Sequence, residues 1–110
     1  MAFAFKSLNF KVTNTKQTVY TTPTGKQTII IGMRVSNKST EVANVTLTRL
    51  AAADSIEYNL IGTETIIPIS SALNVADGNR FVFMVGDQVK VQANANDLLD
   101  LTIEYLELDV

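Results

Sequence analysis

Residues 28–35 (TIIIGMRV) form the longest apolar, β-branched run of the chain, and a turn pattern stands directly before it. Apolar or small residues occupy both parities of this run: Ile29, Ile31, Met33 and Val35 on one side, Ile30 and Gly32 on the other. Such a run is typical of a strand that is covered on both faces. We therefore expect a central strand here, with the protein's own core on one face and a second layer or a neighbouring subunit on the other.

Turn signals divide the rest of the chain into short segments. Thr22-Pro23-Thr24-Gly25 has Pro at the second position and Gly at the fourth, which is the pattern of a type I β-turn. Asp77-Gly78 and Gly86-Asp87 are two further turn dipeptides. The residues predicted to act as structural turns are Pro23, Gly25, Gly78, Gly86 and Asp87.

Alternation of apolar and polar residues predicts short strands between these turns and no convincing helix. The last of them is a long strand from Leu99 to about Leu108, and Pro68 is expected to end a strand or to place it at an edge. About eight strands with turns at this spacing are typical of an antiparallel sandwich or jelly roll. The sequence therefore predicts an all-β fold, a single antiparallel β-sandwich or jelly-roll-like domain.

Two arrangements of Phe81 and Phe83 are open at this stage. If Gly86 and Asp87 form a two-residue type II′ hairpin, Met84 lies opposite Val89 and both Phe rings share a mostly polar face. The rings would then be an association surface. A longer loop would shift the register and bury them instead.

Residues 1–16 are expected to be an N-terminal strand or docking arm that is part of the same domain as the sandwich of residues 17–110. Phe3 and Phe5 precede the clear alternation that begins at Phe10. They would either dock on another chain or pack on their own sandwich.

Charge is unevenly distributed along the chain. Residues 1–55 carry seven basic and two acidic residues, a net of +5, and residues 56–110 carry two basic and nine acidic residues, a net of −7. One interpretation is that N- and C-terminal strands lie side by side and neutralise each other. The other is a bipolar protomer whose basic and acidic faces meet between subunits.

The composition offers little for catalysis. His and Cys are both absent, which removes the usual general base, the thiol nucleophile and most transition-metal sites. Asp77 to Asn79 and Asn94 to Asp97 offer oxygen ligands without the spacing of an EF-hand loop, so ordinary turns are expected. We expect no enzyme activity, no cofactor and no metal.

A net charge of −2 argues against a nucleic-acid partner, since such proteins usually carry a basic surplus. No apolar run approaches the length of a membrane span, of about 18 residues or more, and no signal-peptide pattern opens the chain. The sequence is therefore interpreted as that of a soluble protein with no membrane partner.

Three segments of the chain form a recognisable pattern: the opener Val19 to Lys26 (VYTTPTGK), the step Gly86 to Val91 (GDQVKV) and the acidic-apolar close Leu106-Glu107-Leu108. In this pattern the sequence resembles small virion structural proteins of tailed bacteriophages. It covers about residues 17 to 108 and implies a β-sandwich in an assembled particle, with no catalytic residues.

On this resemblance, the expected function is a capsid decoration or cement protein that binds the major capsid protein as a homo-oligomer, for example a trimer. It would reside in the virion and be assembled in the host cytoplasm. The alternatives are a neck, tail or baseplate protein, or a carbohydrate- or receptor-binding module that displays the loops 37–40 and 93–97. The expected interface residues are the exposed apolar groups Phe3, Phe5, Ile29, Ile30, Ile31, Phe81 and Phe83.

Overall fold

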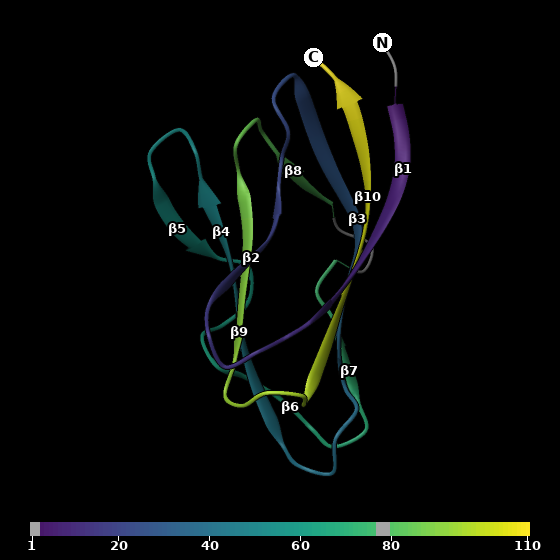
Figure 1. Ribbon diagram of the computed structural model, residues 1–110, viewed down its shortest axis with the longest axis vertical. Helices are drawn as coiled ribbons and strands as arrows, with labels where there is room; N and C mark the ends of the chain where they lie inside the picture. The colour runs from purple at the N-terminus through teal and green to yellow at the C-terminus, as the bar shows by residue number, and fades with distance from the viewer. Residues whose placement is uncertain (1–2, 77–79) are drawn as a thin grey trace.

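The computed structural model describes residues 3–76 and 80–110, which form ten β-strands in two facing sheets (Figure 1). In chain order the strands are β1 (Phe3–Lys11), β2 (Gln17–Thr21), β3 (Lys26–Asn37), β4 (Ala43–Ala51), β5 (Ile56–Asn59), β6 (Thr65–Ile67), β7 (Ala72–Asn74), β8 (Phe81–Phe83), β9 (Gln88–Ala93) and β10 (Leu99–Asp109). Among these residues no helix is long and apolar enough to cross a membrane.

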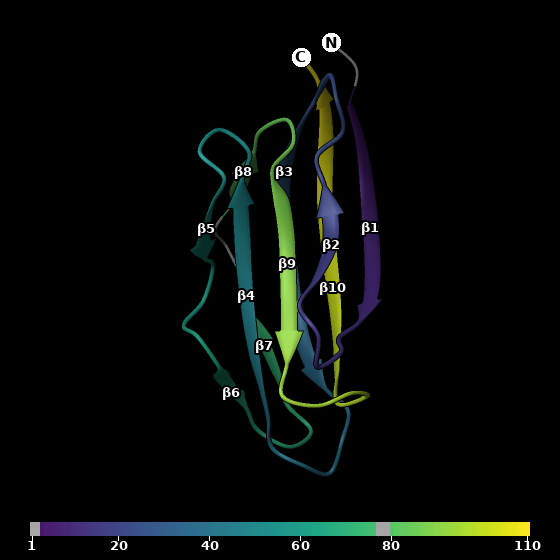
Figure 2. The same ribbon diagram turned by 60° about the vertical axis from the view of Figure 1, so that its left-hand side comes forward.

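Sheet A has the order β1-β10-β3, and both β7 and β8 pair with β3. Sheet B has the order β2-β9-β4, and both β5 and β6 pair with β4; Figure 2 shows β9 between β2 and β4. Every pairing is antiparallel. If β5 with β6, and β7 with β8, are each taken as one interrupted strand, the chain is an eight-stranded jelly roll. The predicted all-β sandwich is confirmed.

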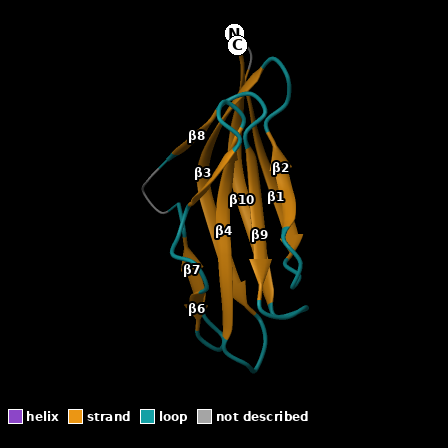
Figure 3. Cartoon of the chain, turned by 90° about the vertical axis from the view of Figure 1, so that its left-hand side faces the viewer, coloured by secondary structure: helices purple, strands orange, loops and turns teal. Residues whose placement is uncertain are grey.

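The core lies between the sheets and follows from the two-residue period of each strand. In β10 every second residue from Leu99 to Glu107 is buried, and β9 and β4 supply the facing layer. The apolar members with at most 1 % exposure include Leu99, Leu101, Ile103, Val45, Leu47, Val89 and Val91. β1 begins and β10 ends at the same end of this sandwich (Figure 3).

β3 is an interior strand of sheet A, in agreement with the predicted central position, but its two sides are not those expected from simple parity. The register with β10 shifts between Glu104, which pairs with Gly32, and Tyr105, which pairs with Ile30. Ile31 is therefore the extra residue of a β-bulge. Because the bulge changes the parity, Ile30 and Met33 both face the core, whereas Ile29 and Ile31 do not.

The turn before β3 closes one residue later than predicted. The Lys26 amide donates to the Pro23 carbonyl at 3.1 Å, so Pro23 is the first residue of the turn and Gly25 the third. Gly25 has φ +79°, the conformation required at the third position of a type II turn. The expected type I turn is wrong because the positive φ, which glycine adopts without a steric penalty, selects the other geometry.

Of the two arrangements left open for residues 81–92, the two-residue type II′ hairpin does not form. β8 pairs with β3 in sheet A, whereas β9 pairs with β2 and β4 in sheet B, so the chain changes sheets at this turn. The Asp87 amide donates to the Met84 carbonyl at 3.0 Å, and Gly86 has φ +84°. Phe83 consequently turns into the core. Gly78, the remaining predicted turn residue, lies outside the described residues.

Asp87 holds this turn against a neighbouring loop. Its carboxylate accepts the Met84 amide at 3.0 Å and the Ala52 amide at 2.9 Å, while its backbone carbonyl accepts the Thr22 amide at 3.0 Å. With 6 % exposure, Asp87 is a buried acid whose oxygens are satisfied by backbone N–H groups. Elsewhere β6 ends at Ile67, directly before Pro68, as predicted.

Candidate functional site

The outer face of sheet A carries a row of four apolar side chains that crosses four strands. Phe5 on β1 pairs with Leu106 on β10, Leu106 pairs with Ile29 on β3, and Ile29 pairs with Val82 on β8. We call Phe5, Leu106, Ile29 and Val82 the outer apolar row. Phe5 is 70 % exposed and Val82 is 46 % exposed, while the two central members are half-buried.

These side chains point outward because their neighbours point inward. Tyr105 and Glu107 on β10 are buried, so Leu106 between them must face away from the core. Ile31, displaced by the bulge, and Met84, after β8, add exposed apolar surface near the row. Apolar side chains that gather on an exposed face are typical of association surfaces.

The other end of the same face is polar. Thr102 donates to the Asn9 side chain at 3.0 Å, and Arg34 donates through Nε to Asn74 at 3.0 Å. A hollow of about 410 Å³ lies over Gly32 and is lined by Arg34, Asn74, Thr102 and Glu104 among others. The outer face of sheet A is thus divided into an apolar end and a polar end.

The central strands of sheet B differ from those of sheet A on their outer side. Thr46 pairs with Gln92, and Thr48 pairs with Lys90, so the outward positions of β4 and β9 include polar residues, of which Thr48 is only 3 % exposed. Ile66, which pairs with Asn44 on the outer side of sheet B, is 67 % exposed. It offers a matched comparison for Phe5, since both are large exposed apolar residues on opposite faces.

The interface residues expected from sequence divide into three groups. Phe5, Ile29 and Ile31 lie together on the outer face of sheet A. Ile30 and Phe83 have 0 % exposure and belong to the core, which leaves them no surface for binding another chain, so that expectation is corrected. The physical reasons are the bulge in β3 and the turn at Gly86, neither of which is encoded in the period-two pattern.

Phe81 faces inward like Phe83 but is only half-buried, because it lies near an open edge between the sheets. The side chain of Phe3 lies outside the described part of the structure. Sequence reasoning missed Leu106 and Val82. Continuing the alternation of the last strand would have placed Leu106 outward.

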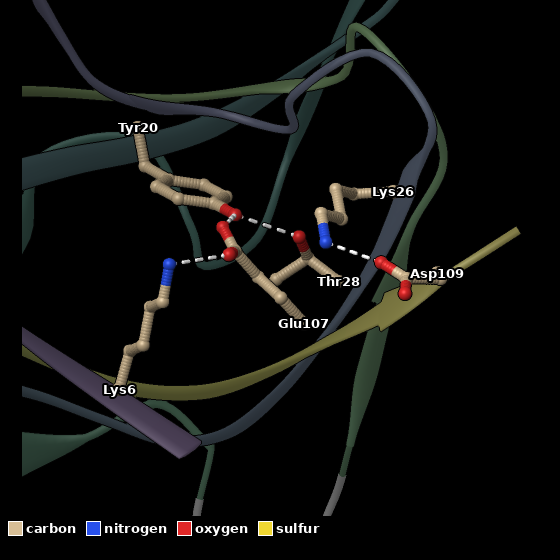
Figure 4. Close-up of polar contacts among 6 residues, drawn as sticks. All are labelled: Lys6, Tyr20, Lys26, Thr28, Glu107 and Asp109. Atoms are coloured by element: carbon tan, nitrogen blue, oxygen red, sulfur yellow. Dashed lines mark hydrogen bonds and ion pairs between the residues drawn. The ribbon is translucent and has the colours of Figure 1, made fainter. Parts of the chain in front are cut away.

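A buried polar cluster links the two sheets near the end of β10 (Figure 4). Glu107 is 6 % exposed, accepts the Tyr20 hydroxyl at 2.6 Å and accepts Lys6 Nζ at 2.7 Å. The hydroxyls of Tyr20 and Thr28 lie 2.7 Å apart. Tyr20 comes from sheet B, whereas Thr28 and Glu107 come from sheet A, so the cluster joins the two layers.

The electrostatics of this cluster indicate a structural role. Lys6, and then Tyr20, hold the pKa of the Glu107 carboxyl below its usual range. Burial, and then the bond to Glu107, raise the pKa of the Tyr20 hydroxyl above its usual range. A general acid or base works best when its pKa is near the working pH. Here the pKa of Glu107 is lowered and that of Tyr20 is raised, so both move further from neutral pH. The cluster is a hydrogen-bonded clamp in which the carboxylate stays ionised and the phenol stays protonated.

Ion pairs connect the two oppositely charged halves of the chain. The four pairs found among residues 3–76 and 80–110 are Lys6–Glu107, Lys16–Glu57, Lys26–Asp109 and Lys38–Asp100. Each joins a base from the first 55 residues to an acid from the remainder. The interpretation that N- and C-terminal strands lie side by side, with bases of one half pairing with acids of the other, agrees with these contacts. Exposed pairs such as Lys38–Asp100 contribute little to stability.

The polar loops considered for glycan or metal binding use their side chains internally. Asn37 is 3 % exposed and donates to the Glu41 and Ile67 carbonyls at 2.8 and 3.0 Å. Asn94 and Asn96 accept backbone amides from other segments, each at 2.9 Å. Asp77 to Asn79 lie outside the described residues, and the described residues contain no group of three or more metal-ligating side chains.

No protein-family model matches the sequence, and no curated protein matches it. Among solved structures, the chain is similar to a subunit of Bacillus endospore appendages, a family of disulfide-linked pili, with TM-score 0.56 and 13 % identity over 99 % of this chain and 88 % of that one. At this identity the likeness is one of fold.

Two weaker likenesses are to virus proteins. A pentameric capsid protein from metagenomic phage sequences has TM-score 0.45 and 13 % identity, covering 94 % of this chain and 68 % of that one. A chain of the T13 IBDV viral particle has TM-score 0.44 and 10 % identity, covering 96 % of this chain and 30 % of that one.

Proposed function

We propose that this protein is a non-enzymatic structural protein of a bacteriophage virion, a capsid decoration or cement protein that binds the major capsid lattice as a homo-oligomer. It would be assembled in the host cytoplasm and reside in the particle. The observation that supports an assembly role is the outer apolar row on sheet A. The assignment to a phage particle rests on the turn-and-strand resemblance of residues 17 to 108.

The row has the properties of a docking surface. Its members come from four adjacent strands, so a partner would meet a pre-formed, rigid face and not a loop. Burying apolar surface stabilises an association by about 25 cal/mol per Å² before the cost of ordering the partners. In a symmetric particle, many copies of a modest contact act together.

In this proposal residues 1–16 and 17–110 form one domain, and β1 supplies Phe5 to the docking surface. The surface retains Phe5, Ile29 and Ile31 from the residues expected at the outset and adds Leu106, Val82 and Met84. Four basic residues of the first 55 pair with acids of the remainder within the chain, which favours apolar contact over bipolar charge as the force that would drive assembly.

A neck, tail or baseplate protein would use the same face and differ in copy number. The fold shared with the endospore pilus subunit also suits a self-assembling fibre, although this chain has no Cys for disulfide links. The carbohydrate-binding alternative is the weakest of these, since Asn37, Asn94 and Asn96 are engaged within the chain.

The test is to mix the purified protein with phage heads assembled without it, pellet the particles and count bound copies per head. Saturation at hundreds of copies supports decoration of the capsid lattice. Binding at a handful of copies, or only to tailed particles, contradicts decoration and supports the neck, tail or baseplate. No binding to either particle contradicts a virion role.

A further inference from the structure

A cleft of about 410 Å³ opens between the sheets at the edge where β5 and β8 lie on the same side of the sandwich (Figures 1 and 2). Both sheets contribute to its lining, which consists of Arg49, Ala51, Tyr58, Asn59, Leu60 and Phe81. Two aromatic rings and two aliphatic side chains make most of this surface apolar. Concave apolar sites with a few polar groups are where proteins usually bind small ligands or anchoring side chains.

Arg49 is the charged residue of this lining, and it has no anionic partner in the described part of the chain. None of the four ion pairs found there includes Arg49. Its Nε atom is buried and has no hydrogen-bond partner. Buried N–H groups are almost always paired, so it is unusual that this half-buried guanidinium finds no acceptor among the described residues.

Arg49 contacts the ring of Phe83, and this contact provides no hydrogen-bond acceptor for the guanidinium. The guanidinium carbon lies 4.1 Å from the centre of the Phe83 ring, and the attraction is that of a cation over an aromatic face. Since Phe83 is fully buried, its ring is a fixed platform on which the guanidinium lies. An arginine held in this way is pre-organised to bind a planar anion through its N–H donors.

Another charged group lies near the cleft, on Asp54. The Tyr58 hydroxyl donates to Asp54 Oδ2 at 2.7 Å, and the Ile56 amide donates to Oδ1 at 3.0 Å. Asp54 forms no ion pair with Arg49. Its carboxylate is therefore bonded to the hydroxyl of the lining residue Tyr58 and does not neutralise the arginine.

We propose that this cleft binds a carboxylate attached to an apolar group, preferably an aromatic one. The carboxylate would bind the Arg49 guanidinium, whose fork of N–H groups matches two carboxylate oxygens, and the apolar group would lie against Tyr58 and Phe81. The ligand is either a free organic acid or an acidic side chain of a partner protein beside an apolar one. The site is distinct from the outer apolar row and does not depend on the proposed function.

The test is a titration of the ¹⁵N-labelled full chain, followed by NMR, with 3-phenylpropionate and separately with its neutral amide. A second arm uses the acetylated and amidated dipeptide of phenylalanine and glutamate, against its glutamine counterpart. We expect shifts at the Arg49 Nε–H and at the Tyr58 and Phe81 amides, with each acid at least about ten-fold tighter than its neutral analogue. Binding of the free acid alone would indicate a small molecule as ligand, and binding of the dipeptide alone would indicate a partner's side chain.

The variant Arg49→Gln should lose the preference for the acid, whereas Lys90→Gln should keep it. Lys90→Gln is the matched control because this substitution also removes one positive charge, but from the outer side of sheet B. Equal binding of acid and amide to the unchanged chain, or binding of neither, would overturn the proposal. Because that comparison needs no variant, it holds even if Arg49→Gln fails to fold.

Discussion

The Tyr20 hydroxyl lies 2.6 Å from Glu107 Oε2, so a side chain of sheet B donates a hydrogen bond to a buried carboxylate of sheet A. The Tyr20 ring also lies 4.7 Å from the Tyr105 ring, centre to centre. One aromatic residue of an edge strand thus contacts the opposite sheet through both its ring and its hydroxyl. We expect this contact to couple the sheets more strongly than the exposed ion pairs do.

Replacing Tyr20 with Phe tests the hydrogen bond while keeping the ring. The substitution removes a donor from a buried carboxylate, and a bond to a charged group contributes about 1.5–3 kcal/mol. We expect the free energy of unfolding, measured by urea denaturation, to fall by about that amount. Tyr58→Phe is the control, because Tyr58 also donates to a carboxylate, that of Asp54, but at the exposed surface. A loss as large in Tyr58→Phe as in Tyr20→Phe would contradict a special role for the buried contact.

Because folding lowers the pKa of Glu107, the free energy of unfolding changes with pH in the acid range. Since the carboxyl titrates at a lower pH when folded than its ordinary value of 4.5, its contribution is fully present above that value. The contribution is lost as the pH falls through the folded pKa. Glu57, whose pKa is lowered first by Lys16 and then by Thr48, acts in the same direction.

We therefore expect the free energy of unfolding to fall between about pH 5 and pH 3, and to fall less steeply in Glu107→Gln. Glutamine can still accept from Tyr20 but does not titrate. Glu104→Gln, an exposed acid on the same strand, should leave the slope closer to that of the unchanged protein. Identical slopes for Glu107→Gln and the unchanged protein would show that Glu107 is not a source of the acid sensitivity.

Alanine substitutions at two glycines can separate the cost of backbone strain from the cost of a steric contact. Gly25 and Gly86 have φ of +79° and +84°, but an added Cβ meets nothing within 4 Å at Gly25 and comes within 3.0 Å of the Ala52 Cβ at Gly86. Alanine at Gly25 should cost about 1 kcal/mol from the left-handed backbone alone. Alanine at Gly86 should cost more, because a neighbouring side chain must also move. Urea denaturation of both variants checks the order, and a smaller cost at Gly86 would contradict it.

The strands that could be predicted from sequence are those whose residues keep a strict two-residue period. Leu99 to Leu108 was predicted as one strand and is part of β10, and the break at Pro68 was placed correctly because Pro has no N–H for the ladder. The charge imbalance left two interpretations open, and the pairing of β1 and β3 with β10 agrees with the first of them. The strand and the break depend on local chemistry, which the sequence carries directly.

The incorrect predictions have physical causes that the two-residue period of a strand does not record. The bulge at Ile31 reversed the parity of β3, and this placed Ile30 in the core and Ile29 in the outer apolar row. The turn at Gly86 sent β8 and β9 into different sheets, which buried Phe83. Both depend on which strand pairs with which, a long-range property. Arg49 carried no sequence signal at all, since its lack of a partner is visible only in three dimensions.

The central claim is that the outer apolar row of sheet A is an association surface. We would measure the solution mass of the protein by light scattering, for the unchanged chain and for Phe5→Ser and Ile66→Ser. The two residues are 70 % and 67 % exposed and lie on opposite sheets, so each variant removes a similar exposed apolar side chain. The account predicts a homo-oligomer that Phe5→Ser dissociates and Ile66→Ser leaves intact. A monomeric unchanged chain at high micromolar concentration, or equal dissociation by both variants, would contradict it.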